Sequence, residues 1–149
     1  MSSRNDALPV HDTVHVEMIP PYADDRGAIQ TLINCQTNNV ALITSKKGTV
    51  RSNHYHKSDW HYMYMISGSA DYYYRPTGSP DEPRRILFKK GDLVFTGNME
   101  DHATVFLEDS MLLAMSGHPR DQETYEGDIV RVELVSPEQA AALAERAGR

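Results

Sequence analysis

Four of the seven histidines in this chain, at positions 54, 56, 61 and 102, form its most chemically suggestive pattern. His54 and His56 are two residues apart, so on a β-strand both side chains leave the same face. His61 opens the next predicted strand and His102 opens a later one, so antiparallel pairing can bring all four imidazoles together. Imidazole suits zinc, iron, nickel, copper or manganese and poorly suits magnesium or calcium. The pattern therefore predicts one divalent transition metal ion per chain (zinc, iron, nickel or manganese).

Spacing alone leaves other interpretations open. Two histidines at positions i and i+2 of a strand are often surface or hydrogen-bonded residues. His61 could pack in the protein interior and leave a site of three histidines, and Asp59 is an alternative oxygen ligand. Because imidazole ligands are neutral, a bound ion keeps its full positive charge. Such a site favours an anionic or enolate-like ligand at an open coordination position.

The elements that must position these residues are short strands separated by turn residues, between residues 13 and 135. Their spacing of 8 to 12 residues predicts a sandwich or barrel rather than an α/β fold. We expect strands at Val14–Ile19, Ala28–Ile33, Val40–Thr44, Val50–His56, His61–Ile66, Ala70–Tyr74, Arg85–Phe88, Leu93–Thr96, His102–Leu107, Met111–Met115 and Ile129–Leu134.

The C-terminal end reads differently. Ser136, Pro137 and Gln139 match an N-cap, a proline at the first helical position and a capping-box glutamine. We expect a short helix over residues 137–146 that packs on the barrel. The prediction is one domain over residues 1–149, with a barrel core at about 40–116, N-terminal strands within 13–44 and a C-terminal strand within 128–135.

Composition excludes several classes of protein. The net charge of −6 gives no basic face able to follow a phosphate backbone, so no nucleic-acid partner is expected. The N-terminus lacks the apolar core of a signal peptide, and no apolar run reaches the roughly 18 residues of a membrane span. We expect a cytoplasmic protein with no membrane partner. The single cysteine, Cys35, is expected to be a buried, inert thiol.

Two segments resemble the paired motifs of the cupin superfamily. Gly48 is followed after five residues by His54-Tyr55-His56, after four more by His61 and after six more by Gly68, which is the spacing of the first motif. Residues 91–106 match the second motif, with His102 at the histidine position. The resemblance implies a single-domain, all-β cupin (a double-stranded β-helix or jelly-roll barrel) with a short C-terminal α-helix.

This chain departs from the cupin pattern at several positions. His61 stands where the family has a glutamate ligand, which implies a possible site of four histidines: His54, His56, His61 and His102. In the second motif, Gly97, Met99 and Phe106 replace the usual proline, glycine and asparagine.

A further resemblance is to the RmlC-like cupins of sugar biosynthesis. Asp25-Arg26-Gly27 looks like the entry segment of dTDP-sugar 3,5-epimerases and 3,4-ketoisomerases. His54-Tyr55-His56-Lys57 looks like the ketoisomerase segment whose histidines act as acid and base. The stretch from Val50 to His56 and the closing segment, 121–134, resemble the C-terminal cupin of the capsular polysaccharide protein CapF. That family's domain binds zinc and is linked to epimerisation beside a sugar ketone.

These resemblances imply an enzyme that removes a proton next to a carbonyl of a keto-sugar or a related small substrate, by isomerisation, epimerisation or dehydration. The candidate catalytic residues are His54, His56, Tyr64 and Glu100. A non-haem Fe(II) dioxygenase and a non-catalytic small-molecule-binding cupin remain alternatives. The expected partner is an anionic or carbonyl-containing small molecule, and the cupin resemblance implies a homodimer.

Overall fold

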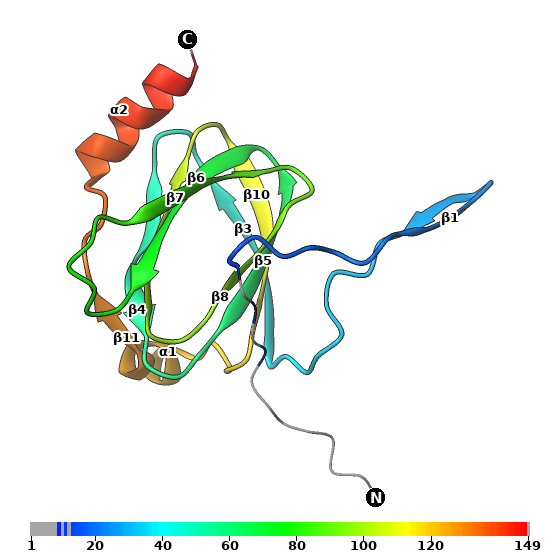
Figure 1. Ribbon diagram of the computed structural model, residues 1–149, viewed down its shortest axis with the longest axis horizontal. Helices are drawn as coiled ribbons and strands as arrows, with labels where there is room; N and C mark the ends of the chain where they lie inside the picture. Colours follow the sequence, from blue (N-terminus) through cyan, green and yellow to red (C-terminus); the bar gives the residue numbers. More distant parts are fainter. Residues whose placement is uncertain (1–8, 10, 12, 149) are drawn as a thin grey trace, which may run out of the picture.

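Two antiparallel sheets form the barrel in the computed structural model, which describes residues 9, 11 and 13–148 (Figure 1). The first sheet has the order β3 (Asn39–Ser45), β10 (Ser110–Ser116), β5 (His61–Ser67) and β8 (Leu93–Thr96). The second has the order β11 (Ile129–Arg131), β4 (Val50–His56), β9 (Glu100–Phe106), β6 (Ser69–Pro76) and β7 (Arg84–Lys89). The predicted all-β architecture is confirmed.

Alternation along the strands separates the interior of the barrel from its outer faces. Met63 and Met65 of β5 lie in an apolar cluster between the sheets with Phe88, Phe106 and Leu112. The intervening side chains of β5 face outward and pack with a second cluster formed by Trp60, Tyr62, Leu93, Phe95 and Met115. His61 shares the inward parity of Met63, so β5 directs one histidine into the barrel.

The N-terminal segment covers the outer face of the first sheet without forming the long strands expected from the sequence. The predicted strand Val14–Ile19 is reduced to one bridge, between His15 and Val94. The predicted strand Ala28–Ile33 is reduced to β2 (Gly27–Ile29), which pairs only with β1 (Tyr22–Asp24). All six residues of this hairpin are exposed, and Figure 1 shows it standing clear of the barrel, so no neighbouring strand extends it.

The C-terminal helix is confirmed as α2 (Pro137–Ala147), with the capping box of Ser136 and Gln139. Its buried residues Ala140 and Ala144 face the second sheet, where Ala140 packs with Val105. The predicted strand Ile129–Leu134 ends at Arg131. A second helix, α1 (Gln122–Asp128), precedes it and was not predicted. None of the helices in the described residues is long and apolar enough to cross a membrane.

Strand β4 carries a bulge that decides which of its side chains enter the barrel. Ser52 and Asn53 have φ angles of 76° and 52°, and the pairing with β9 shifts between Ser52 and His54. The Asn53 side chain accepts hydrogen bonds from the backbone N–H groups of Leu134 (2.9 Å) and Val135 (3.2 Å) and donates one to the Val135 carbonyl (2.8 Å). As a result Val50 packs outward toward α2, whereas His54 points inward.

Cys35 is exposed, so the expectation of a buried thiol is wrong. The residue lies in the connection between β2 and β3 and not in a strand.

Candidate metal centre

The four histidines meet at one end of the barrel interior, as the spacing predicts. His54 and His56 come from β4, His61 from β5 and His102 from β9, and each is at most 5 % exposed. Ring centroids lie 4.8 Å apart for His54 and His56, 4.8 Å for His54 and His102, and 5.3 Å for His61 and His102. The direct pairing of His54 with His102 across β4 and β9 follows from the register after the bulge.

The donor nitrogens lie close enough to share an ion. One nitrogen each from His54, His56 and His102 lies within 4.8 Å of the other two. His61 falls outside this group, although its Nε2 lies 3.5 Å from Nε2 of His102. Two nitrogens that ligate one tetrahedral zinc ion at 2.0–2.1 Å are separated by about 3.4 Å. The spacing of this pair therefore suits shared ligation.

Hydrogen bonds on the opposite ring nitrogens fix the orientation of two of these histidines. Nδ1 of His102 donates to the Glu100 carbonyl oxygen at 2.9 Å, and Nδ1 of His56 lies 3.3 Å from Oδ2 of Asp128. In the neutral rings these contacts leave the Nε2 lone pairs available. Nε2 of His56 is buried and has no hydrogen-bond partner. An unpaired buried acceptor costs about 1–3 kcal/mol, so this nitrogen fits a metal ligand better than a packing residue.

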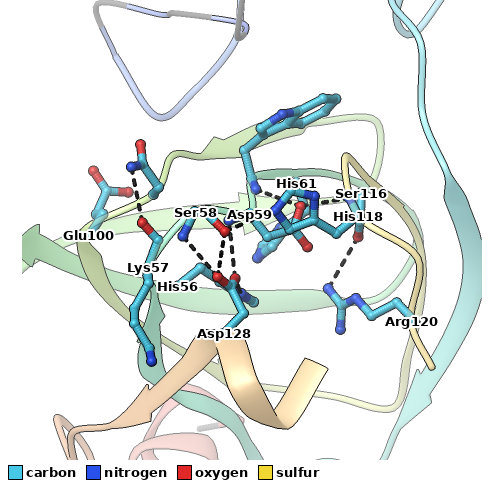
Figure 2. A network of polar contacts seen from close by, with 12 residues as sticks. His56, Lys57, Ser58, Asp59, His61, Glu100, Ser116, His118, Arg120 and Asp128 are labelled. Carbon is cyan, nitrogen blue, oxygen red and sulfur yellow. Dashed lines mark hydrogen bonds and ion pairs between the residues drawn. The ribbon is translucent and has the colours of Figure 1, made fainter. Parts of the chain in front are cut away.

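Asp128 is the centre of the polar network shown in Figure 2. Its Oδ1 accepts hydrogen bonds from the backbone N–H and the hydroxyl of Ser58 (2.9 and 2.6 Å), and Oδ2 accepts one from the Asp59 N–H (3.1 Å). Burial alone would raise the pKa of Asp128, but these hydrogen bonds outweigh it and hold the pKa below its ordinary value. The ionised carboxylate can therefore orient His56, as second-sphere carboxylates do at metal sites.

Asp59 lies near the same histidine but is already engaged. An oxygen of Asp59 falls within 4.8 Å of the donor atoms of His56 and Asp128. Its Oδ1 accepts hydrogen bonds from the N–H groups of Trp60 (2.8 Å) and His118 (2.9 Å), which connect the β4–β5 turn to the segment after β10. These contacts account for its burial without a metal ion.

All four imidazoles are held neutral by their surroundings. Burial, with smaller contributions from neighbouring histidines, lowers the pKa of His54 to about 2. Burial also lowers the pKa of His102 to about 3, that of His56 below its ordinary value and that of His61 well below it. Because metal ligation requires neutral imidazole, the chain presents these side chains in the protonation state that a metal ion needs.

The histidine cluster is flanked by two residues that were not predicted from the sequence, Arg120 and Tyr125. The Arg120 guanidinium lies 4.8 Å from the centroid of the Tyr125 ring, and its Nη2 donates to the Ser116 hydroxyl at 3.2 Å. The Tyr125 ring lies 6.1 Å from His54 and 6.2 Å from His56. These residues lie on or beside α1, whose position follows from the pairing of β11 with β4.

The two remaining catalytic candidates have different positions. Tyr64 packs in the outer cluster of the first sheet, on the opposite face of β5 from His61, because side chains alternate along a strand. Its candidacy as a base at the histidine site is therefore wrong. Glu100 has the same parity as His102, and its Oε1 is buried without a hydrogen-bond partner. Burial raises the pKa of Glu100 to about 7, although a hydrogen bond with Tyr72 opposes the shift.

Glu100 also lines a cavity of about 580 Å³ between the N-terminal segment and β6. Tyr74, Arg75, Arg84 and Asn98 lie in the same wall. None of the four clustered histidines lines this cavity, so Glu100 is the candidate residue that faces it.

Comparisons with known proteins agree with this architecture. No family model and no curated protein matches the sequence. Among solved structures, the 3,4-ketoisomerase QdtA from Thermoanaerobacterium thermosaccharolyticum superposes with a TM-score of 0.65 at 20 % identity, covering 93 % of this chain and 97 % of QdtA. CapF from Staphylococcus aureus gives 0.58 at 20 % identity, covering 76 % of this chain and 34 % of CapF.

A third similar structure is the dTDP-4-dehydrorhamnose 3,5-epimerase from Sulfolobus tokodaii, with a TM-score of 0.58 at 16 % identity, covering 70 % of this chain and 69 % of the epimerase. At these identities the likeness establishes the fold. The architecture matches that implied by the motifs at Gly48–Gly68 and Gly91–Phe106. The chain has the fold of the RmlC-like cupins.

Proposed function

We propose that this protein is a metal-dependent isomerase or epimerase acting on a keto-sugar or a related small carbonyl compound. The observation that carries the proposal is the buried histidine cluster, in which Nε2 of His56 has no partner while Nδ1 is held by Asp128. A bound cation would supply the partner that this buried nitrogen lacks. A histidine-to-asparagine mutant of the ketoisomerase QdtA has been solved in complex with TDP-4-keto-6-deoxyglucose, which supports a carbonyl-bearing sugar as the substrate class.

His54, His56 and His102 would hold the ion, with His61 as a fourth ligand. When bound, a divalent transition metal ion supplies Lewis-acid polarisation to an oxygen of the substrate.

The chain itself orients the His56 ring, excludes water from the site and supplies a proton acceptor. Asp128 fixes the His56 ring, and the apolar cluster around Met63 and Met65 excludes water from beneath the site. Glu100 is the proposed general base. Although it lines the neighbouring cavity, it hydrogen-bonds with Tyr72, whose ring centroid lies 6.3 Å from that of His102, and its pKa of about 7 suits proton transfer at neutral pH. In this scheme the Glu100 carboxylate takes the proton from the carbon beside the carbonyl and returns it at the isomerised position.

Metal analysis of the purified protein is the first test. We expect about one zinc, iron, nickel or manganese ion per chain at pH 7.5. His56→Asn should lose it, and the control His15→Asn, which changes a half-exposed histidine paired with Asp92, should keep it. Protein that carries no metal and takes none up after dialysis would overturn the metal-dependent mechanism. The histidines would then be read as a metal-free acid and base.

An anaerobic assay on the metal-loaded protein separates the rival reactions. An isomerase retains its turnover without oxygen, whereas loss of turnover would identify a non-haem iron dioxygenase. Saturable binding of keto-sugars without any product would instead identify a binding module.

We also propose a homodimer. The edge strand β3 exposes Val40 (59 %) and Leu42 (64 %), and the β1–β2 hairpin exposes Tyr22 (64 %) and Ile29 (68 %). Burial of these side chains against a second copy would stabilise the pair. Light scattering should give about twice the chain mass of 16.8 kDa, and Leu42→Glu should shift the protein toward monomer. A monomer at all concentrations contradicts the proposal.

A further inference from the structure

Arg120 has no acidic partner, although its guanidinium is partly buried beside the histidine cluster. In the part of the chain that the structure describes, Arg26, Arg75, Arg85 and Arg131 each pair with a carboxylate, but Arg120 does not. Among the described residues, its one hydrogen bond goes to the neutral hydroxyl of Ser116. Its Nε is buried and has no hydrogen-bond partner.

Burying the Arg120 guanidinium without an acidic partner costs free energy unless another group compensates its positive charge. Guanidinium stays protonated at any physiological pH, so burial cannot neutralise it as it neutralises a histidine. The ring face of Tyr125 offers a cation–π contact, which satisfies none of the in-plane N–H donors. The Nε–H group and the other unpaired N–H groups of the guanidinium therefore remain available to donate to a planar acceptor such as a carboxylate.

The Arg120 guanidinium also lies where it could contact a small molecule bound at the histidine cluster. Ser116, its partner, lies directly opposite His61 in the pairing of β10 with β5. Tyr125, on which it stacks, has its ring 6.1 Å from His54 and 6.2 Å from His56. In Figure 2 Arg120 contacts Ser116 on one side of the polar network, and Glu100 lies on the other side.

The charge around the cluster favours an anion at this position. The four imidazoles are neutral, and the nearby carboxylates of Asp59 and Asp128 already accept hydrogen bonds from N–H groups of the β4–β5 turn and of His118. A single guanidinium suits a singly charged planar group, whereas a diphosphate calls for several cations or a nest of backbone N–H groups.

We propose that Arg120 binds a carboxylate of the substrate, so that the substrate is a carbonyl compound carrying a carboxylate near the reacting carbon. The unpartnered Nε–H, the stacking on Tyr125 and the position beside His61 carry this assignment. It rests on the proposed function, because it names the substrate class of the same site. The carboxylate anchored at Arg120 would place the carbonyl over the histidines, with its adjacent carbon toward Glu100.

The test is a titration of the full chain with pyruvate, followed by NMR of the arginine Nε–H signals, on metal-loaded and on chelator-treated protein. We expect a saturable shift of the Arg120 signal in both forms. Arg120→Gln should weaken pyruvate binding by about tenfold or more, and Arg120→Lys should restore only part of it because ammonium lacks the planar fork. The matched control Arg131→Gln removes a positive charge nearby, at an exposed side chain paired with Glu126, and should leave the affinity unchanged.

Each other outcome overturns the assignment. An Arg120 signal that does not respond to pyruvate, or equal affinity in Arg120→Gln, excludes Arg120 as the carboxylate-binding residue. Tighter binding of inorganic phosphate than of pyruvate excludes a carboxylate as the preferred group. Failure of metal uptake would contradict the proposed function. The titration of chelator-treated protein would still test pyruvate binding at Arg120, so the two failures are distinguishable.

Discussion

The interior of this barrel has an apolar end and a histidine end. The two are equally buried, but only the histidine end contains a ring nitrogen without a hydrogen-bond partner. At the apolar end Met65 and Phe88 are 0 % exposed and fill space against one another. At the other end His56 and His102 are 1 % and 0 % exposed, yet His56 keeps a ring nitrogen without a partner. Burial therefore does not distinguish core from site here. The distinguishing feature is a buried polar atom that no side chain or backbone group satisfies.

The largest expected effect lies at the apolar end. Phe88→Ala should lower the free energy of unfolding by about 3–5 kcal/mol, because it leaves a cavity among fully buried neighbours. Urea denaturation of the metal-free protein measures this change. Leu87→Ala, at the adjacent half-exposed position of β7, is the matched control and should change stability far less. Equal losses in the two variants would mean that the barrel interior is not the stabilising core.

The histidine end should respond to metal instead. Zinc at about 100 times its dissociation constant should stabilise the wild type by about 2.7 kcal/mol. His102→Asn should abolish this gain, whereas His118→Asn should keep it, because His118 contacts Ser58 and lies outside the cluster. Thermal melts with and without zinc measure the difference. Zinc stabilisation that survives in His102→Asn would place the ion elsewhere.

Asp128 should affect metal affinity without being a ligand. Asp128→Asn should weaken zinc binding by about 10- to 100-fold, since the His56 ring loses its charged partner. Competition against a chromophoric chelator gives the affinities. Glu126→Gln, an exposed change on the same helix, is the control. Unchanged affinity in Asp128→Asn would show that the His56–Asp128 contact only supports the fold.

The effect that is smallest per group and per pH unit is the dependence of stability on pH. An unfolded histidine takes up a proton near pH 6.5, whereas native His54 and His102, with pKa values of about 2 and 3, do not. Between pH 6.5 and pH 3 the unfolded state therefore binds more protons, and stability falls as the pH falls. Each of the two groups contributes up to about 1.4 kcal/mol per pH unit. Urea titrations of chelator-treated protein at pH 7.5, 5.5 and 4.5 should show this slope, reduced in His102→Gln. An equal slope in that variant would contradict the shift assigned to His102.

The barrel and the convergence of His54, His56 and His102 were predictable because each residue occupies a motif position on a strand with clear alternation. The flanking residues Arg120 and Asp128 were not. They belong to a segment with no buried helical stripe, and α1 itself has no buried residue, so periodicity gave no signal. Their place beside the cluster follows from the pairing of β11 with β4, a contact between segments about 75 residues apart.

Tyr64 and the N-terminal strands illustrate a second limit. Tyr64 was a candidate base because of its residue type alone, whereas alternation along β5 turns its side chain to the opposite face of the strand from His61. The segments Val14–Ile19 and Ala28–Ile33 carry strand-like residues, yet a strand forms only where a partner edge is available. In this barrel β8 offers that edge at only one bridge.

The bulge at Ser52 and Asn53 divides β4 into a part that packs against α2 and a part that carries the histidines. Before it, the Val50 side chain belongs to the surface that receives α2; after it, His54 and His56 belong to the metal centre. Substitutions at the helix-packing surface can therefore accumulate without changing the register of the histidines. A deletion of one residue between Val50 and His54 would bring these two constraints into conflict. In a lineage of such proteins, the length of this segment should therefore vary less than its composition.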